Sequence, residues 1–404
     1  MSEIEKAVAY LRSTDAIRQR CRQVYAAGER GALKHFRLHP GKIDDAARYV
    51  GAVMRESYPR NDIPYHSRWR HFDVGGIDRW AMLSHTIAPQ DRAKAAADLA
   101  TVSVLLDAGA GPGWGYSEAG SKTRVGRSEG LAVASLHLFE QGLFSGDPAQ
   151  PFRVDGAGLG ELTTECIARG FQVTVDNPLV GLDARVELLR RFGAALKARP
   201  DVFGAEARFG NAITFLTRGG PSVAASAILA MLLDTLSPIW PSGLVFHGTN
   251  LGDVARHPQA KGDGLTDGFV PFHKLSQWLA YSLLEPLEWD GAVVTGLDDL
   301  TGLPEYRNGG LFVDLGVLEP IGSAWTGAPL DPRAEPVVEW RALTVILLDE
   351  TAARLRAQRG LTAEQLPLAK VLQGGTWTAG RKIAAQMRPG GPPPIAVATD
   401  GTTF

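Results

Sequence analysis

The chain has 404 residues, 45% of them hydrophobic and 21% charged, which is ordinary globular composition and long enough to bury a large core. Its formal net charge of -2 disfavours a protein that envelops nucleic acid, because such a protein carries a basic excess that displaces counterions from phosphates. The two cysteines, Cys21 and Cys166, cannot build a disulfide framework or a cysteine-rich metal site, and we expect both thiols to be buried.

The N-terminal segment is charged throughout and lacks the apolar run of a signal peptide. No window of the sequence approaches the ~20 apolar residues of a membrane span. We therefore expect a cytoplasmic protein without a membrane segment.

Apolar residues recur at helical spacing over Ile4–Val24, which predicts a first helix that Gly28 ends. Pro59 and Pro64 then force an extended stretch. Further helices are predicted at Asp44–Tyr58, Gln90–Leu106, Ser128–Gln141 with Ser128 as N-cap, Gly158–Arg169, Leu182–Ala198, Ser222–Leu236, Phe272–Leu284 and Val337–Gln358. Short extended runs are predicted at Gln172–Val175, Leu244–His247 and Ile395–Ala398, and a turn at Gly210–Pro221.

The order of these elements shows neither strand–helix–strand alternation nor an internal repeat, which disfavours a parallel-sheet fold. The sequence therefore predicts a mainly α protein with a few short strands. We expect one α-rich catalytic domain over residues 1–388, followed by a Pro/Gly-rich C-terminal tail over residues 389–404.

A first cluster of polar and aromatic residues occupies Tyr65–Phe72. Arg68 and Arg70 could bind a phosphate or carboxylate, because a guanidinium group matches planar oxyanions. The alternative is a loop in which Trp69 and Phe72 anchor in the core while the arginines form surface ion pairs.

A second cluster combines glycines and aromatic residues over Leu105–Tyr116. Its pattern matches neither of the two common nucleotide-binding glycine motifs. We instead predict a tight loop that presents Trp114 and Tyr116 as flat walls, with Asp107 at a helix end. Glu129 follows in the next helix, where a carboxylate is also favourable simply as a partner of the helix dipole.

A third cluster lies in Asp267–Trp278, where Phe272 belongs to a buried stripe and Gln277 lies elsewhere on the first turns of a predicted helix. Lys274 near a helix N-terminus is electrostatically unfavourable for the helix, which hints at another use.

The fourth cluster is Thr301–Asp314. Pro304 is predicted to open a helix at its first position. Four consecutive side chains, Glu305–Asn308, could then hold a polyhydroxylated ligand, and a carboxylate there could act as a general base or stabilise a sugar oxocarbenium ion. The alternative is a capping acid with a surface arginine as partner.

The whole chain resembles a family associated with uracil catabolism in fungi and bacteria, the Urc/Urg group. The resemblance implies a route in which the uracil ring is opened while attached to ribose phosphate, leaving a ribosyl-urea species to be split. The strings that carry it are Ile63–Phe72, Leu105–Tyr116, Arg127–Ser135, Val270–Leu279 and Thr301–Gly310.

The chain is also similar, more distantly, to queuosine-salvage nucleosidases, which implies a helical DNA-glycosylase-like architecture. Three strings match in the same order, Phe272–Gln277, Glu305–Arg307 and Glu339–Ala342. The acid is Glu305 where that family uses aspartate, which lengthens its reach by one methylene.

These resemblances lead to the hypothesis of a nucleosidase-like N-ribosyl hydrolase that splits a ribosyl-urea 5′-phosphate. Glu305 would be the first catalytic carboxylate, with Asp314 or Asp107 as the second. Nine residues separate Glu305 from Asp314, about 13 Å along a straight helix, which is too far for a tight dyad. The residues assigned to substrate binding are His66, Arg68, Arg70, His71, Trp114, Tyr116, Glu129, Phe272, Lys274, Gln277, Tyr306 and Arg307.

Two other functions stay open. One is an amidohydrolase or phosphoribosyl transferase on a pyrimidine-derived substrate, and the other is a non-enzymatic ligand-binding or partner subunit of the pathway. His66 and His71 do not complete a zinc-binding spacing, so we expect no metal and no cofactor. The expected partner is a small ribosyl or phosphoribosyl molecule, without nucleic acid or membrane.

Overall fold

In this computed structural model, the described residues are 1–120, 124–241, 243–322, 325 and 328–398. Helices make up 56% of the structure and strands 8%, so the prediction of a mainly α protein with a few short strands is confirmed. Within the described residues, the strands form only two-stranded sheets. No helix in these residues is long and apolar enough to cross a membrane.

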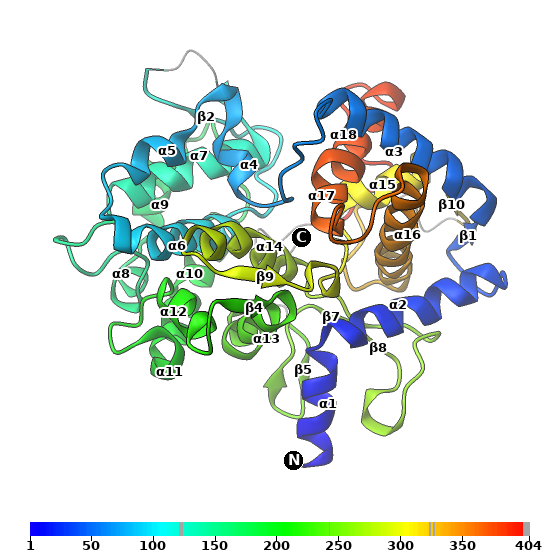
Figure 1. Cartoon of the computed structure of the whole chain (residues 1–404), viewed down its shortest axis with the longest axis horizontal. Coiled ribbons are helices and arrows are strands. Elements are labelled where there is room, and N and C mark those ends of the chain that lie inside the picture. The colour runs from blue at the N-terminus through cyan, green and yellow to red at the C-terminus, as the bar shows by residue number, and fades with distance from the viewer. Residues whose placement is uncertain (121–123, 242, 323–324, 326–327, 399–404) are drawn as a thin grey trace. The chain divides into compact units, whose positions relative to one another are not determined.

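The contacts divide the chain into two compact units, each built from segments that are far apart in sequence (Figure 1). Unit 1 comprises residues 1–66, 244–277 and 296–398, and unit 2 comprises the described residues of 67–243 and 278–295. The expectation of one catalytic domain over residues 1–388 stays a prediction, because a compact unit defined by contacts need not fold independently.

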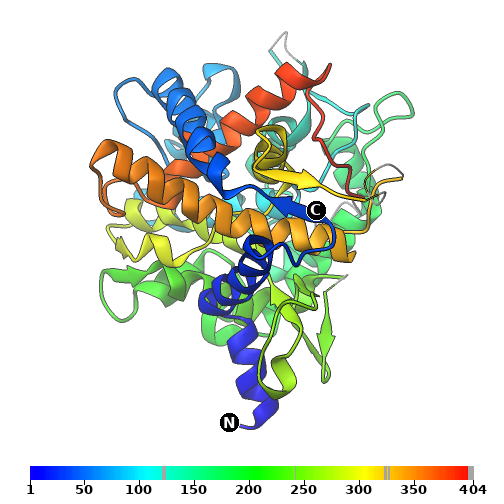
Figure 2. The same ribbon diagram turned by 90° about the vertical axis from the view of Figure 1, so that its right-hand side faces the viewer.

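Unit 1 is organised around the long helix α16 (Glu335–Arg359), which packs against α2 (Thr14–Glu29) and α3 (Ile43–Ser57) (Figure 2). Helix α15 (Tyr306–Asp314) packs against α18 (Trp377–Met387). The other elements are α1 (Glu3–Leu11), β1 (Phe36–Leu38), η1 (Pro40–Lys42), β5 (Val245–Phe246), β6 (Thr249–Asn250), β7 (Val254–Arg256), η5 (Gly264–Thr266), β8 (Phe269–Pro271), η6 (Leu297–Asp299), β10 (Leu318–Pro320), α17 (Leu368–Val371) and the π-helix η7 (Leu372–Thr376).

Helix α14 (Lys274–Trp289) contributes residues 274–277 to unit 1 and its remaining residues to unit 2. In unit 2, α6 (Arg92–Leu105) packs against α7 (Arg127–Glu140). The other elements are α4 (Trp69–Phe72), η2 (Val74–Gly76), α5 (Arg79–Ser84), η3 (Pro89–Asp91), β2 (Tyr116–Ser117), β3 (Arg124–Val125), α8 (Gly156–Gly160), α9 (Thr164–Gly170), α10 (Leu182–Lys197), α11 (Pro200–Phe203), α12 (Asn211–Thr217), β4 (Ser222–Ala224), α13 (Ala225–Leu236), η4 (Ser237–Ile239) and β9 (Val293–Thr295).

Four strand pairs, β1–β10, β2–β3, β5–β6 and β7–β8, are antiparallel. Strands β4 and β9 pair in parallel, with Ser222 opposite Val293. These pairs join segments of one unit that are up to hundreds of residues apart, as in the pairing of Phe36 with Pro320.

Long periodic segments were predicted closely. The predicted Leu182–Ala198 helix is α10, and the predicted Val337–Gln358 helix is α16, which ends at Gly360 in the left-handed conformation (φ 64°) that glycine adopts without steric cost.

Several other predictions were wrong for local reasons. The first helix breaks at Ser13, whose side chain caps α2, and Gly28 does not end that helix but lies buried within it against Leu33 and Leu38. The predicted turn at Gly210–Pro221 contains helix α12.

Further corrections concern the middle of the chain and the cysteines. The predicted helix Gly158–Arg169 is two short helices, α8 and α9, each capped by its own side chain, Asp155 and Thr163. The start of the predicted helix Ser222–Leu236 is strand β4. Cys21 is buried as expected, whereas Cys166 is partly exposed.

The segment after Arg388 packs onto unit 1 as far as it is described. Ile395 is buried, and Val397 forms an isolated bridge with Leu330 in place of the predicted extended run Ile395–Ala398. The predicted run Gln172–Val175 likewise contributes only one bridge, from Thr174 to Asn177.

Candidate functional site

Glu305 is the N-cap residue of α15. Its backbone is extended (φ -111°, ψ 165°), and its two carboxylate oxygens accept hydrogen bonds from the backbone N–H groups of Arg307 at 2.7 Å and Asn308 at 2.5 Å. The helix therefore begins at Tyr306, and the prediction that Pro304 occupies its first position was wrong. The Glu305 carboxylate accepts two N–H groups that would otherwise be unpaired at the end of the helix. This cap explains why the helix begins after Glu305 and not at Pro304.

Burial raises the pKa of Glu305 above the usual value for glutamate, although the two backbone hydrogen bonds and the charge of Lys274 lower it in part. A carboxyl group with a raised pKa can exchange a proton nearer to neutral pH than an exposed glutamate. Glu305 therefore has one property of a general acid or base.

Lys274 is the first residue of α14, and its backbone N–H donates to Asp253 at 3.0 Å. The Asp253 carboxylate also accepts hydrogen bonds from both terminal nitrogens of Arg341, at 2.9 and 2.7 Å. Burial by itself would raise the pKa of Asp253, but the charge and hydrogen bonds of Arg341 more than offset it and bring the pKa to about 2. Asp253 thus supplies the negative charge that the N-terminus of α14 lacks in its own sequence.

Phe272 and Gln277 complete this part of unit 1. The Arg341 guanidinium carbon lies 4.1 Å from the centre of the Phe272 ring. The buried Gln277 side chain donates to the Thr301 hydroxyl at 2.6 Å, and its oxygen accepts the Thr301 N–H at 3.3 Å. Gln277 therefore ties the first turn of α14 to the segment that leads into Glu305.

Tyr306 and Arg307, predicted to bind substrate, lie on the first turn of α15. Tyr306 is exposed, and the Arg307 guanidinium carbon lies 5.1 Å from its ring centre. The Nη1 atom of Arg307 donates to the Gly391 carbonyl at 2.7 Å, so this side chain fastens the C-terminal segment to α15.

Asp314, predicted as a second catalytic carboxylate, is the last residue of α15, whereas Glu305 caps the first turn. Both of its oxygens accept hydrogen bonds from Arg388, at 2.8 and 2.6 Å, and its side chain is only 3% exposed. This geometry gives Asp314 a structural partner at the far end of the helix from Glu305.

His66 belongs to unit 1 and contacts the π-helix η7. Its Nδ1 atom lies 2.9 Å from the Gln373 side-chain oxygen, and burial lowers the pKa of His66 to about 4. The imidazole is therefore neutral near pH 7.

Arg68 lies in unit 2 and is fully buried. Its Nε donates to the Ser103 hydroxyl at 2.7 Å, and its Nη1 donates to Asp107 at 2.5 Å and to the Ser128 hydroxyl at 3.0 Å. The guanidinium carbon also lies 5.5 Å from the centre of the Trp278 ring.

Asp107 follows the C-terminus of α6 and accepts the Ser128 hydroxyl at 2.6 and 2.7 Å. Burial raises its pKa, and Arg68 lowers it in part. Ser128 was predicted to cap α7, but the N-cap is Gly126, because the Ser128 hydroxyl bonds to Asp107 instead.

Arg70 and His71 occupy different surroundings from Arg68. Arg70 pairs with Glu285 at 2.9 Å and with Asp73 at 3.6 Å, and its side chain is 28% exposed. The buried His71 ring meets Trp278 edge-on, with ring centres 5.6 Å apart.

Trp114 and Tyr116 are packed residues of unit 2. Trp114 is 4% exposed, and its indole N–H donates to the Phe171 carbonyl at 2.9 Å. Tyr116 pairs with Val125 between β2 and β3 and stacks on His137 at 6.1 Å. Burial lowers the pKa of Arg68, and the charges of Asp107 and of Glu129, in the first turn of α7, offset this in part.

A family model described as a protein of unknown function, DUF1688, matches residues 10–404 of this chain. The chain belongs to this family. Protein urg3 of Schizosaccharomyces pombe is 40% identical over 417 residues, which cover 99% of each chain. Uracil catabolism protein 4 of Lachancea kluyveri is 36% identical over 443 residues, covering 99% of this chain and 100% of the relative. The resemblance predicted from the five sequence strings is confirmed.

In this DUF1688 chain, unit 1 brings together Phe272, Lys274, Gln277 and Glu305, and it also holds His66, Tyr306, Arg307 and Asp314. Unit 2 brings together Arg68, Asp107 and Glu129, and it also holds Arg70, His71, Trp114 and Tyr116.

Sequence reasoning missed Asp253 and Ser103 as members of these clusters, and it assigned Ser128 only the role of a helix cap. Arg341 lies in the Glu339–Ala342 string that the sequence analysis singled out by its resemblance to the nucleosidases. Asp253 is a lone acid in a loop and carried no signal of its own. Within the described residues, no group of three or more His, Cys, Asp or Glu side chains is placed to hold a metal ion.

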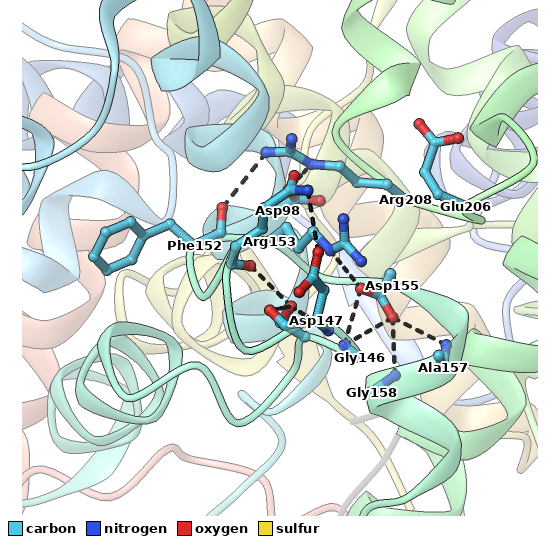
Figure 3. Close-up of polar contacts among 12 residues, drawn as sticks. Asp98, Gly146, Asp147, Phe152, Arg153, Asp155, Ala157, Gly158, Glu206 and Arg208 are labelled. Atoms are coloured by element: carbon cyan, nitrogen blue, oxygen red, sulfur yellow. Dashed lines mark hydrogen bonds and ion pairs between the residues drawn. The ribbon is translucent and has the colours of Figure 1, made fainter.

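Unit 2 also contains a cavity of about 370 Å³ lined by residues that the sequence analysis did not assign to a functional site. Figure 3 shows the neighbouring Asp155 carboxylate, which already accepts the N–H groups of Gly146, Ala157 and Gly158. The backbone donors beside this cavity are therefore occupied by a side chain of the protein itself. The lining residues are Leu143, Ser145, Gly146, Ala157, Gly158, Glu161, Leu162, Cys166 and Lys197.

Proposed function

We propose that this protein acts in uracil catabolism as an N-ribosyl hydrolase, which splits a ribosyl-urea 5′-phosphate into ribose 5-phosphate and urea. One relative is named for uracil catabolism and aligns over nearly the full length of both chains, which supports the pathway. The observation that carries the reaction is the partly buried Glu305 carboxyl group, with its raised pKa and its two backbone hydrogen bonds, at the start of α15.

In the proposed reaction, the bond between ribose C1′ and the urea nitrogen breaks, and a water oxygen bonds to C1′. The leaving nitrogen takes up a proton, so the products are neutral urea and the sugar phosphate. The ionised Glu305 carboxylate accepts a proton from the attacking water and stabilises the positive charge that develops on the ribose ring. Each oxygen keeps a second lone pair for this purpose after accepting one backbone hydrogen bond.

In this proposal, the role of Lys274 is to keep the Glu305 carboxylate ionised. Its charge lowers the pKa of Glu305 and so favours the ionised form that the reaction needs. Asp253 and Arg341 act as positioning residues, because Asp253 holds the backbone of Lys274 and is itself held by Arg341.

The test measures urea and ribose 5-phosphate released from ribosyl-urea 5′-phosphate by purified wild-type, Glu305→Gln and Glu305→Asp proteins. We expect Glu305→Gln to lose most of its turnover, in the range of about 10²–10⁴-fold for a general base. The control is Glu319→Gln, which removes an exposed carboxylate of unit 1 that is paired with Arg37 and His39. Glu305→Gln protein that is folded and as fast as wild type would show the mechanism to be wrong.

One observation favours a second candidate, a ligand-binding subunit without turnover. Both Glu305 oxygens already accept helix N–H groups, which is what a purely structural cap would do. Such a subunit would bind ribosyl-urea 5′-phosphate in calorimetry without releasing urea, and Glu305→Gln would change its melting temperature more than its affinity. Release of ammonia would instead indicate an amidohydrolase, and a requirement for diphosphate would indicate a transferase.

A further inference from the structure

One nitrogen of the Arg68 guanidinium in unit 2, Nη2, makes no hydrogen bond within the part of the chain that the structure describes. The residue is 0% exposed. Its other nitrogens are bonded to Ser103, Asp107 and Ser128. A buried guanidinium N–H without a partner is costly, so such a group in a native protein calls for an explanation.

The position of this donor is fixed by its neighbours. Nη1 of the same guanidinium reaches the Ser128 hydroxyl on the first turn of α7, so Nη2 lies at the N-terminus of that 14-residue helix. The helix begins with Arg127 in the left-handed region (φ 56°), a conformation that side-chain-bearing residues rarely adopt and that concentrates at ligand sites. The backbone there is also tightly packed, since a Cβ on Gly130 would lie 3.0 Å from the Trp114 ring.

The charges around Arg68 select the kind of ligand. Asp107 already forms an ion pair with Arg68 and is held in place by two contacts with Ser128. Glu129 adds a second carboxylate within electrostatic reach of Arg68. Arg185 is also within electrostatic reach of Arg68 and Asp107. The two carboxylates therefore balance the two guanidinium charges, and the cluster has no net positive charge left to bind a phosphate dianion.

We propose that Arg68 Nη2 and Glu129 form a binding subsite for an uncharged polar group that accepts one hydrogen bond and donates another, of the hydroxyl or ureido kind. Its oxygen accepts the Nη2 hydrogen, and its O–H or N–H donates to the Glu129 carboxylate. This proposal differs from the expectation that Arg68 binds a phosphate or carboxylate. The subsite lies wholly within unit 2, and the inference does not depend on Glu305 or on turnover.

The test is binding to the full-length protein, measured by calorimetry and by ligand-observed NMR, with N-ribosylurea, urea, ribose and inorganic phosphate as separate probes. We expect Arg68→Lys, which keeps the charge but removes Nη2, to weaken N-ribosylurea binding by about tenfold or more, the value of a hydrogen bond to a charged group. Binding of urea alone would assign the ureido group, and binding of ribose alone would assign a hydroxyl.

Glu129→Gln is the second variant. The direction in which it changes the affinity distinguishes an uncharged ligand from a phosphate, even if Arg68→Lys does not fold. For an uncharged ligand, loss of the charged acceptor weakens binding. For a phosphate, loss of the same negative charge strengthens binding. The matched control is Arg79→Lys, which changes another buried arginine of unit 2 that is paired with Glu118 and is expected to leave N-ribosylurea binding unchanged. Tighter binding of phosphate than of N-ribosylurea to the wild-type protein, or N-ribosylurea binding that neither variant alters, would overturn the proposal.

Discussion

The two carboxylate oxygens of Asp253 accept hydrogen bonds from the two terminal nitrogens of Arg341, 88 residues further along the chain. The backbone carbonyl of Asp253 also accepts the N–H groups of Phe272 and His273, and its carboxylate accepts the N–H of Lys274. Asp253 thus caps helix α14 although it lies 21 residues before Lys274 in the sequence, and Arg341 holds it in place. The position of Lys274 relative to Glu305 depends on this pair.

We predict that Asp253→Asn lowers the free energy of unfolding by about 3 kcal/mol, because it leaves the buried Arg341 guanidinium without its counter-charge. Chemical denaturation measures the effect. The control is Asp331→Asn, since Asp331 pairs with Arg333 on the surface, where both side chains are more than half exposed and such pairs contribute less than about 1 kcal/mol. Equal losses in the two variants would contradict a special role for the buried pair.

The same pair predicts a loss of stability in acid. The folded-state pKa of Asp253 is lowered to about 2 from an ordinary value of 3.8. Its contribution is therefore fully present above pH 3.8 and is lost as the pH falls toward 2. Unfolding curves of the wild type and of Asp253→Asn should converge over this range, and parallel curves would contradict the prediction.

Turnover is predicted to depend on the ionised form of Glu305. Because burial raises the pKa of Glu305, activity should be half-lost at a pH above 4.5, the ordinary value for glutamate. Lys274→Met removes a charge that lowers this pKa, so the midpoint should move further up. A pH–rate profile with the same midpoint in both proteins would argue that the two residues are not coupled.

The effect of Glu305 on stability has the opposite sign to that of Asp253. Its pKa is raised in the folded state, so its contribution is present below pH 4.5 and is lost as the pH rises through the raised value. Glu305→Gln should therefore flatten the stability profile on the alkaline side of pH 4.5, which denaturation at several pH values can detect.

Helices α15 and α18 pack through a glycine that leaves no room for a side chain. A Cβ on Gly380 would lie 2.3 Å from the carbonyl oxygen of Arg307, in the first turn of α15. Gly380→Ala should lower the free energy of unfolding by about 2 kcal/mol, as overpacking does, and should also disturb the Glu305 cap. Gly41→Ala is the control, because a Cβ there has no neighbour within 4 Å.

Arg185 holds the chain after α6 that carries Asp107. Its guanidinium donates to the carbonyl groups of Leu106, Ala108 and Gly109, at 2.5 to 3.0 Å, and burial lowers its pKa to about 10. Arg185→Met would leave these carbonyls unpaired, and each buried group left unpaired costs about 1–3 kcal/mol.

Chemical denaturation should show this loss for Arg185→Met, and hydrogen exchange should show weaker protection around residue 107. Arg191→Met, on the same helix, changes an exposed pair with Glu187 and should cost less than about 0.5 kcal/mol. Unchanged protection in Arg185→Met would mean that the loop is held by other contacts.

The sequence by itself determined the features that depend on neighbours along the chain. The apolar period of 3.6 residues placed α10 and α16 within a few residues, because helix hydrogen bonds are local. Long sequence strings were enough to place the chain in its family. The same strings contain Glu305, Lys274 and Arg68.

Only the tertiary structure decided how those residues are used. Ser128 is a good helix cap by local preference, but the Asp107 carboxylate brought close to it by folding takes its hydroxyl. Asp253 carried no signal in the sequence, yet it caps α14 and binds Arg341. Hydrogen bonds and ion pairs act over a few ångströms of space, and the fold brings together donors and acceptors that are tens to hundreds of residues apart in sequence, so local patterns cannot reveal them.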